Sequence, residues 1–343
     1  MVLPFGRTNY TGNRLSMISI GRRRADFVGR PSNMERSPII LEWGSWMVKV
    51  GIADDGIPKH LVIPEDDDNE DNHGWNGKST PQTTEEWYFL INPIIIQCWD
   101  RLLLSHNTNR KVVILHPPVM SRAWELAITQ SLWNLGVPAF VFVCILDTPP
   151  LALEWNRGMI VHVGKSEVCC IAHADGHSLT STLTIAPCGY EAAVSDSSKL
   201  EASSWTNTMD QVWLNENNPN SLILAIAKCI EATPMVLRKD IADNIVFCGE
   251  TILIVPALPT KVCDRLHDIL HQTSQSLDYC PSELTLHPVN WSKLRPLTFT
   301  PQSTGPYRAD MVSWIGAALW ATIWHRHGDE DNSPIPWTYA PTK

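Results

Sequence analysis

Alternating apolar and polar residues first form a clear pattern near residue 40. Residues 39–43 are apolar apart from Glu42, and after Gly44 and Ser45 the side chains of residues 46–52 alternate in polarity. A period of two is typical of a strand with one buried face, and a glycine between two such runs favours a tight turn. The pattern predicts a strand, a turn and a second strand.

The same pattern recurs further along the chain. Residues 159–163 and 168–172 form strand-like runs that are separated by Gly164, Lys165 and Ser166. Each of the two units is followed by further segments of strand and helix character. A repeated unit of this kind indicates two related halves that face each other across a cleft.

The stretch between the two hairpins has a strand–helix–strand pattern. Residues 112–115 and 139–145 are apolar runs suited to strands. Between them, Ser121 is a suitable N-cap and Gly136 a suitable terminator for a helix. Strands joined in this order through a helix run parallel, with helices on the faces of their sheet, so we expect an α/β fold.

Further elements are expected on both sides of this unit. An apolar segment over residues 90–104 is interrupted by Pro93, which lacks the N–H that a helix interior needs. The second half contains an apolar helix over 222–230, a helix capped by Thr233 with Pro234 in its first position, a strand over 245–248, a loop over 249–251, and helices over 260–271 and 311–323.

Four segments are too polar to bury much apolar surface. Residues 1–36 are rich in Arg, residues 64–86 contain the acidic run 65–71, residues 195–220 are rich in Asn and Ser, and residues 325–343 follow the last apolar helix. Such compositions favour solvated or disordered chain. We expect a disordered N-terminal extension, a solvated acidic loop rather than a metal site, a linker and a polar tail.

Composition limits the class of protein. The formal net charge of −9 argues against a nucleic-acid binder, because neutralising phosphates needs a surplus of Lys and Arg. The nine Cys residues form no CxxC pair and mostly lie in apolar runs, as reduced and buried thiols do. With no run of about 20 apolar residues and no signal-peptide core, we expect a soluble intracellular protein without membrane insertion.

Other candidate chemistry is weaker. Two Gly-Lys-Ser triplets, 77–79 and 164–166, lack the glycine that a P-loop requires five residues earlier. Cys263, His267 and His271 have helical spacing suited to zinc, but no fourth ligand is evident, so an ordinary helix face is the better interpretation. His325 and His327 precede an acidic stretch of the tail, and we expect no site there. The 15 Trp residues are expected mainly in the core, with some as interface anchors.

Several stretches together resemble the actin family. Residues 42–51 (EWGSWMVKVG) resemble the first phosphate loop of actin, and residues 312–317 (VSWIGA) resemble its penultimate helix. Residues 158–165 and 244–251 fall where the family has its second phosphate loop and its adenosine-side loop. The resemblance covers residues 38–324. It implies an actin-like, ribonuclease H-like duplicated α/β fold with two facing lobes around a nucleotide cleft.

Within that family, some stretches are similar to the divergent actin-related proteins of the dynactin pointed-end complex. They are residues 109–114, 136–139, 238–244 and 335–337. The resemblance implies a first lobe over 37–158 with a shortened acidic insertion at 64–86, a second lobe over 159–310, a helix over 311–324 that returns to the first lobe, and a tail over 325–343.

The residues of the expected nucleotide pocket match the family only in part. By resemblance, the positions that would contact any remaining nucleotide are Gly44, Ser45, Lys49, Gly164, Gly249 and Thr251. Trp46 stands where the family has a second glycine, so its indole should collide with a phosphate or close the turn. Glu42 replaces the family's first Asp, which keeps the charge but extends the side chain by one methylene.

The second loop and its neighbours depart further. His162 and Lys165 occupy the positions of two family Asp residues, so the loop cannot organise Mg²⁺ in the family's way. Ile145 lies near the position of the water-orienting Gln, whose loss removes a main contribution to hydrolysis. Glu250 interrupts a Gly-Gly pair and adds a negative charge where nucleotide would lie. These departures favour a degenerate pocket with no catalytic residues, no metal and no required cofactor.

The resemblance implies a non-catalytic scaffold at the pointed end of the dynactin filament. We expect the other dynactin subunits as partners, including the actin-related filament and pointed-end proteins, and a role in dynein-dependent microtubule transport in the cytoplasm and cytoskeleton. The short acidic segment should discourage further polymerisation, as a filament cap would. Two alternatives are a nuclear actin-related subunit of a chromatin-remodelling complex and a nucleotide-binding actin-like ATPase.

Overall fold

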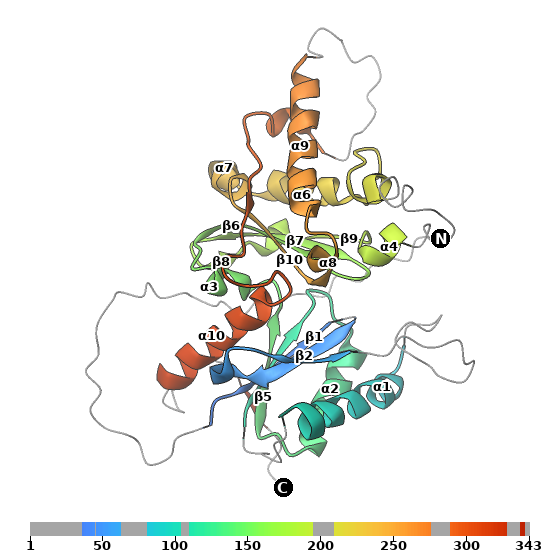
Figure 1. Cartoon of the computed structure of the whole chain (residues 1–343), viewed down its shortest axis with the longest axis vertical. Coiled ribbons are helices and arrows are strands. Elements are labelled where there is room, and N and C mark those ends of the chain that lie inside the picture. The colour runs from blue at the N-terminus through green and yellow to red at the C-terminus, as the bar shows by residue number, and fades with distance from the viewer. Residues whose placement is uncertain are drawn as a thin grey trace.

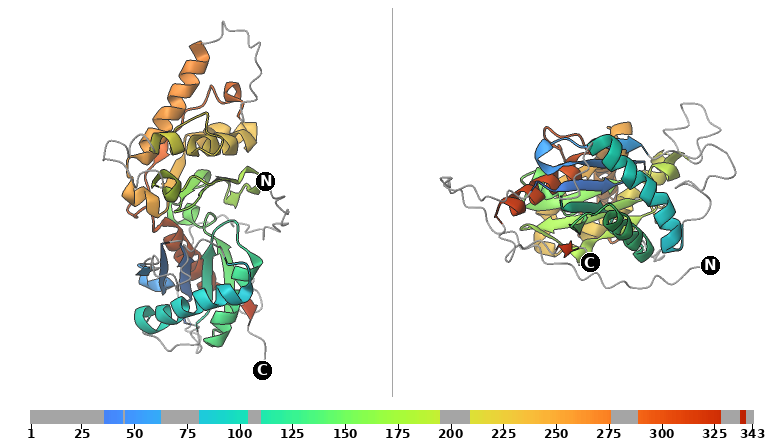
Figure 2. Two further views of the ribbon diagram at one scale, coloured as in Figure 1. Left: turned by 90° about the vertical axis from the view of Figure 1, so that its right-hand side faces the viewer. Right: turned by 90° about the horizontal axis from the view of Figure 1, so that it is seen from below.

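The chain forms two α/β lobes, each built on one mixed sheet with helices on its faces (Figure 1). The computed structural model describes residues 36–44, 46–62, 81–103, 110–194, 209–275, 289–327 and 337–339. The second lobe lies beyond the first along the long axis of the molecule, and α9 (Leu258–Gln275) extends away from the first lobe (Figure 2). The expected α/β class and two-lobed organisation are confirmed.

The sheet of the first lobe combines parallel and antiparallel strands. In order across the sheet they are β12 (Thr338–Tyr339), β5 (Ala139–Cys144), β4 (Val112–His116), β1 (Ile39–Trp43), β2 (Met47–Ile52) and β3 (Lys59–Val62). β1 pairs parallel with β4, and β4 pairs parallel with β5. The β1–β2 and β2–β3 pairs are antiparallel. The sequence pattern therefore predicted both the hairpin and the strand–helix–strand unit correctly.

The sheet of the second lobe is built in the same way. Its strands are, in order, β11 (Pro301–Gln302), β10 (Ile245–Cys248), β6 (Arg157–Val163), β7 (Val168–Ala174) and β8 (His177–Ser178), while β9 (Thr184–Ala186) also pairs with β7. β6 pairs antiparallel with β7 and parallel with β10, which in turn pairs parallel with β11. The second predicted hairpin is thereby confirmed.

The two lobes repeat one topology. β1, β2, β4 and β5 correspond to β6, β7, β10 and β11 in chain order, neighbour and direction. Helices lie between the corresponding strands: α1 (Thr84–Gln97) and α2 (Arg122–Asn134) in the first lobe, and α6 (Leu222–Ala232), α7 (Arg238–Ala242), α8 (Glu250–Ile254) and α9 (Leu258–Gln275) in the second. The turns of the two hairpins, β1–β2 and β6–β7, therefore have corresponding positions in the two lobes.

Shorter elements complete the fold. They are α3 (Pro149–Ala152), α4 (Tyr190–Val194), the π-helical turn Cys98–Leu103 after α1, and the 3-10 turns Ala53–Asp55, Thr180–Thr182, Met235–Leu237 and Trp291–Lys293. The long helix α10 (Val312–His327) leaves the second lobe and packs on the first sheet through Trp314, Ala317 and Ala321. The predicted apolar helix over 311–323 is present, and it continues to His327.

Apolar side chains form a core on each face of the first sheet, one core in the second lobe and a smaller cluster between the lobes. Ile91, Ile95 and Ile128 are among the residues that join α1 and α2 to the first sheet. In the second lobe, α6 is apolar and buried except at Lys228, Glu231 and Ala232, and it packs on the face of β7. Burial of these faces is the main stabilising term for both lobes.

Helix starts follow the capping residues of the sequence. The Ser121 hydroxyl accepts a hydrogen bond from the Trp124 amide and begins α2 as predicted. The Ser221 hydroxyl accepts from the Leu224 amide in the same way and begins α6. Both caps satisfy an N–H group that the helix itself leaves unpaired.

The extent of the acidic loop was predicted wrongly. Thr83 and Glu86 form a reciprocal capping box, so α1 begins at Thr84 and the predicted loop over 64–86 ends before it. Pro93 does not interrupt this helix. It lies on the exposed side of α1, where losing one backbone hydrogen bond is tolerated.

Two predictions for the second half were also wrong. Thr233 ends α6 instead of beginning a helix, and its hydroxyl donates to the Cys229 carbonyl. The predicted loop over 249–251 is the start of α8, because the chain turns into a helix directly after Gly249. In the tail, Thr338 and Tyr339 pair with β5, and Lys111 lies over the Trp337 and Tyr339 rings.

Some predictions concern residues outside the described ranges. These are the N-terminal extension up to residue 35, the acidic run 65–71, the triplet 77–79 and most of the linker. Within the described ranges the cysteines are free and buried, as expected. No helix in that part of the chain is both long and apolar enough to cross a bilayer.

The return of α10 depends on a close approach at Gly316. A Cβ atom at this position would lie 2.0 Å from the Thr148 carbonyl oxygen, just before α3. The Thr148 hydroxyl donates to the Ser313 carbonyl at 2.8 Å, which fixes the same contact from the other side. Only glycine leaves room for the two backbones to meet in this way.

We therefore predict that Gly316→Ala destabilises the protein by about 1–3 kcal/mol. Alanine favours a helix by about 1 kcal/mol over glycine, so the loss would arise from the clash alone. Urea unfolding followed by circular dichroism measures the change. Leu319→Ala, at a more exposed position of the same helix, should cost much less, and an equal loss in both variants would contradict the close-approach argument.

Candidate functional site between the two hairpins

The candidate site lies where the first hairpin meets the start of α8 in the second lobe. Glu42 is the fourth residue of β1 and Lys49 is the third of β2, and the two are direct cross-strand partners. Glu250 is the first residue of α8, directly after Gly249. Gly249 has φ +103°, a conformation that glycine adopts readily, and this turns the chain from β10 into α8.

The Lys49 ammonium group is held by three acceptors from three segments. Its Nζ atom lies 2.5 Å from Glu42 Oε1 and 3.0 Å from Glu250 Oε1. It also donates to the Asp310 carbonyl oxygen at 2.6 Å. Lys49 is 1% exposed and Glu42 2%, so this ion cluster is shielded from water. We call Glu42, Lys49, Glu250 and the Asp310 carbonyl the lysine clasp.

The two carboxylates of the lysine clasp share one cation, but their pKa values shift in opposite directions. Burial raises the pKa of Glu42 to about 7, although Lys49 opposes the change. Its second oxygen, Oε2, is buried without a hydrogen-bond partner in the described structure, which also disfavours a full charge. Burial would raise the pKa of Glu250 as well, but Lys49 and His162 outweigh burial and lower it.

Lys49 remains charged in this environment. Burial alone would lower the pKa of an ammonium group. The Glu42 and Glu250 carboxylates outweigh that effect and raise the pKa of Lys49. With Lys49 and Glu250 charged and the pKa of Glu42 raised to about 7, the cluster carries little net charge near neutral pH, which limits the cost of burying it.

The second hairpin contributes groups that do not resemble a metal site. His162 lies within electrostatic reach of Glu250 and Lys49, and burial lowers its pKa, so it is neutral at pH 7. Lys165 is 5% exposed and pairs with Glu191 at 3.5 Å. A neutral imidazole and an ammonium group offer Mg²⁺ none of the oxygen ligands that it prefers.

The turn of the second hairpin is bonded to its own neighbours. Thr251 Oγ1 donates to the Gly164 carbonyl at 2.9 Å, and the Gly164 amide donates to Glu167 within the hairpin. The amides of Gly189 and Tyr190 donate to the Ser166 and Gly164 carbonyls. Each predicted pocket residue in this turn therefore has a structural role.

A second contact joins the lobes beside the lysine clasp. The Trp46 ring, next to the first turn, lies edge-on to the Tyr190 ring of α4, with centroids 5.1 Å apart. Trp46 was expected to collide with a phosphate or to close the turn, and its observed position is against the other lobe. An aromatic pair of this geometry contributes about 0.5–1.5 kcal/mol beyond its buried area.

The position between the turns is filled by a side chain. A Cβ atom on Gly44 would lie 3.1 Å from Glu250 Oε1 and 2.9 Å from the Met47 carbonyl. The Glu250 carboxylate therefore lies against the first turn, at the position expected for an anionic ligand. These residues do not fit a bound Mg²⁺–nucleotide, because a fixed carboxylate already neutralises the lysine that would bind its phosphates.

The structure brings most of the predicted pocket together. Gly44, Lys49, Gly164, Gly249 and Thr251 lie around the lysine clasp, as the contacts above show. Ser45 lies outside the described residues. Ile145 is buried among Cys144, Leu146 and residues of the second sheet, so this cluster joins the lobes through apolar contacts.

Sequence analysis missed two members of the site. The Asp310 carbonyl is a backbone group just before α10, and no side-chain pattern could reveal it. Tyr190 lies 26 residues after Gly164, and only the fold brings it to Trp46. The helix start at Glu250 could have been found from the Gly249–Glu250 pair, since glycine often precedes a sharp change of direction.

The other candidate sites do not assemble. His267 Nε2 accepts a hydrogen bond from the Phe299 amide at 2.8 Å, Cys263 is buried in the core and His271 is exposed, so the three α9 residues lie in different environments. In the described part of the chain no three His, Cys, Asp or Glu residues gather as metal ligands. The side chains of His325 and His327 lie outside the described set.

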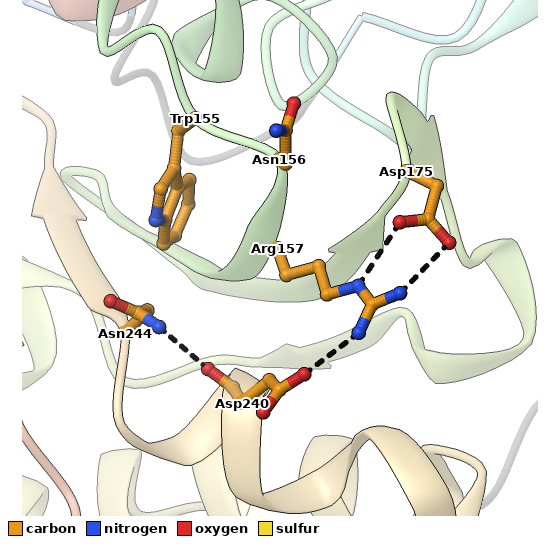
Figure 3. A pocket seen from close by; sticks show the side chains of 6 residues that line it. All are labelled: Trp155, Asn156, Arg157, Asp175, Asp240 and Asn244. Atoms are coloured by element: carbon orange, nitrogen blue, oxygen red, sulfur yellow. Dashed lines mark hydrogen bonds and ion pairs between the residues drawn. The ribbon is translucent and has the colours of Figure 1, made fainter.

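A shallow hollow on the second lobe is occupied by an ion-pair network (Figure 3). It is lined by Trp155, Asn156, Arg157, Asp175, Asp240 and Asn244. The Arg157 guanidinium donates to Asp175 at 3.0 Å and to Asp240 at 2.8 Å. Asp175 and Asp240 thus both pair with this cation. The ion-pair network joins α7 to the start of β6 and to the residue that follows β7.

Comparison with known proteins leaves the family open. No protein-family model matches this chain, and no curated protein matches it significantly in sequence.

Removing the cation of the lysine clasp should be costly. We predict that Lys49→Met destabilises the protein by about 3–5 kcal/mol, because it leaves the Glu250 charge buried without its counter-ion and both carboxyl groups without their shared donor. Urea unfolding at pH 7 measures the loss. Lys293→Met removes an exposed lysine that pairs with Glu231, and it should cost less than about 1 kcal/mol. Equal costs would show that the lysine clasp contributes no more than a surface ion pair.

The raised pKa of Glu42 predicts a pH dependence of stability. Its ordinary value is 4.5 and its folded value is about 7. Between these values the folded protein holds a proton that the unfolded chain has released, so this contribution to stability falls as pH rises from 4.5 to 7. The total change is about 3 kcal/mol.

The test compares wild type with Glu42→Gln in urea unfolding at several pH values between 4.5 and 8. The stability difference, wild type minus variant, should decrease as pH rises through this window. Glu85→Gln, at an exposed residue of α1, controls for the substitution itself. A difference that stays constant or increases with pH would mean that Glu42 is ionised throughout.

Proposed function

We propose that this chain is a non-catalytic actin-related scaffold subunit with an actin-like fold, acting at the pointed end of the dynactin filament. The repeated sheet topology supports the fold, since each lobe has a hairpin, two parallel strands and intervening helices in the same order. The stretches that resemble the family fall on the corresponding elements, with residues 42–51 on β1 and β2 and residues 312–317 on α10.

One observation carries the non-catalytic part of the proposal. The Glu250 carboxylate lies 3.0 Å from Lys49 Nζ and against Gly44, where a phosphate would have to bind. His162 and Lys165 add no carboxylate at the second turn, and Ile145 offers no polar atom to orient water. A site of this composition lacks the groups that position a nucleophile and balance charge in phosphoryl transfer.

The same contacts suit a rigid scaffold. In a nucleotide-dependent machine, the ligand couples the two lobes, and their relative position changes with ligand state. Here the lysine clasp and the Trp46–Tyr190 pair join the lobes from within the chain. The subunit would keep one shape without a cofactor. That property suits a protein that ends a filament and presents fixed surfaces to other dynactin subunits in the cytoplasm.

Nucleotide independence is directly testable. We predict that Mg²⁺ with millimolar ATP or ADP leaves the melting temperature of the purified full chain unchanged, because a ligand stabilises only a state that binds it. Differential scanning fluorimetry measures this, with actin as a positive control in the same plate. A Mg²⁺-dependent rise of several degrees would revive the nucleotide-binding alternative.

The partners are tested by affinity capture of the tagged full chain from cell extract at moderate salt, with quantitative mass spectrometry. We expect stoichiometric recovery of the actin-related filament and pointed-end subunits of dynactin. Recovery of a chromatin-remodelling ATPase would replace the proposal with the nuclear alternative. Recovery of neither complex would overturn the scaffold assignment.

A further inference from the structure

The outer edge of the first sheet is closed by a very short strand. β12 consists of Thr338 and Tyr339 alone and pairs antiparallel with Phe140 and Ala139 of β5. Both of its side chains are exposed, that of Tyr339 by 58%. A strand with so few contacts opens at a lower free-energy cost than the buried strands of the same sheet.

β5 offers more edge than β12 covers. Successive residues of a strand direct their backbone groups to opposite neighbours, and the Ile145 amide, in register with β5, donates to the His116 carbonyl of β4. The even-numbered residues Phe140 and Phe142 therefore direct their N–H and C=O groups to the outer edge. Thr338 lies opposite Phe140, but among the described residues no strand lies opposite Phe142 on this side. A longer strand would pair with Phe142 as well.

The chain's own segment is poorly suited to a longer pairing. The second residue before Thr338 is Pro336, which has no N–H to donate to a neighbouring strand. β12 begins only at Thr338. A segment with any other residue in place of this proline would be able to pair over a longer stretch of β5.

Two aromatic rings add side-chain recognition at this edge. Trp337 and Tyr339 are two residues apart, so their side chains lie on the same face of the sheet. The Lys111 Nζ atom, just before β4, lies 5.1 Å from the centroid of the Trp337 ring and 5.9 Å from that of the Tyr339 ring. Trp337 also packs on the apolar cluster between the first sheet and α10. An ammonium group over ring faces favours aromatic residues at both positions.

We propose that the outer edge of β5 is a docking site for an extended segment of another protein that has aromatic residues two positions apart. Backbone hydrogen bonds to Phe140 and Phe142 supply affinity, and the two rings at Lys111 supply specificity. In the absence of that partner the chain's own C-terminal segment occupies the site. Its effective concentration is on the order of millimolar, so only a segment that pairs over a longer stretch displaces it.

The site is separate from the lysine clasp and from the choice of complex. It consists of β5, Lys111 and the C-terminal segment, none of which belongs to the lysine clasp. Loss of the proposed dynactin assignment would leave it intact. A second copy of this chain is disfavoured as the partner, because it would supply the same segment with Pro336 and would pair no better than the chain's own.

The first test supplies the strand in trans. A fluorescent synthetic peptide of residues 335–343 is titrated into the full chain and into its Thr338→Pro variant, and anisotropy gives the dissociation constants. Thr338→Pro removes the N–H that faces Phe140 and so weakens the competing strand. We expect saturable binding to the variant and binding at least about tenfold weaker to wild type. No saturable binding to the variant, or equal binding to both chains, would overturn the proposal.

Peptide variants separate backbone pairing from ring contacts. Pro336→Thr in the peptide should tighten binding several-fold, because it restores the missing N–H. Trp337→Ala combined with Tyr339→Ala in the peptide should weaken binding several-fold. On the chain, Lys111→Met should weaken binding, and Lys261→Met, at an exposed lysine of α9, should not. Equal binding with and without the rings would contradict the proposed recognition. Circular dichroism confirms that each chain variant keeps its fold.

Hydrogen exchange of the wild-type chain tests the site without a chain variant. Fragments that contain Thr338 should exchange much faster than fragments of β4, and the Pro336→Thr peptide should slow exchange in the β5 fragment that contains Phe142. A C-terminal fragment as protected as β4, or unchanged exchange in β5 with the peptide, would overturn the proposal. Sedimentation velocity tests the second copy, since a wild-type dimer that Thr338→Pro abolishes would overturn the assignment to another protein.

Discussion

The structure depends on how the positive charge of one buried lysine, Lys49, is neutralised by acceptors from both lobes. An ammonium group taken out of water costs several kcal/mol unless it gains close and well-placed acceptors. Lys49 obtains them from β1, from the start of α8 and from the chain just before α10. Only one of these segments belongs to the same hairpin. The compensation of this one charge therefore requires both lobes and the returning helix to be in place together.

The repeated topology explains why the charge lies there. Corresponding hairpins in the two lobes present their turns to the same region, and a parallel strand follows beside each hairpin. In the second lobe that strand, β10, delivers Gly249 and Glu250 to the first turn. A carboxylate from one half thus meets a lysine from the other. The same arrangement brings Trp46 to Tyr190, so a polar and an apolar contact act at one junction.

Elements with a strong local signal were predictable from sequence, and those defined by distant contacts were not. The hairpins, α2 and α6 follow from alternation and capping residues. Short strands such as β3 and β12 exist because a neighbour pairs with them, so their own residues carry little signal. Pro93 led to the wrong prediction of an interrupted helix, because proline is tolerated better on an exposed face of a helix. For the site, residue types suggested a filled pocket, but only the fold shows that Glu250 fills it.

A double-mutant cycle between Lys49 and Glu250 tests most directly whether this ion pair joins the two lobes. Urea unfolding of wild type, Lys49→Met, Glu250→Gln and the double variant gives the coupling free energy between Lys49 of the first lobe and Glu250 of the second. We expect a favourable coupling of at least about 1.5 kcal/mol, at the upper part of the range for residues in contact. A coupling within about 0.5 kcal/mol of zero would contradict the claim that this lysine holds the lobes together.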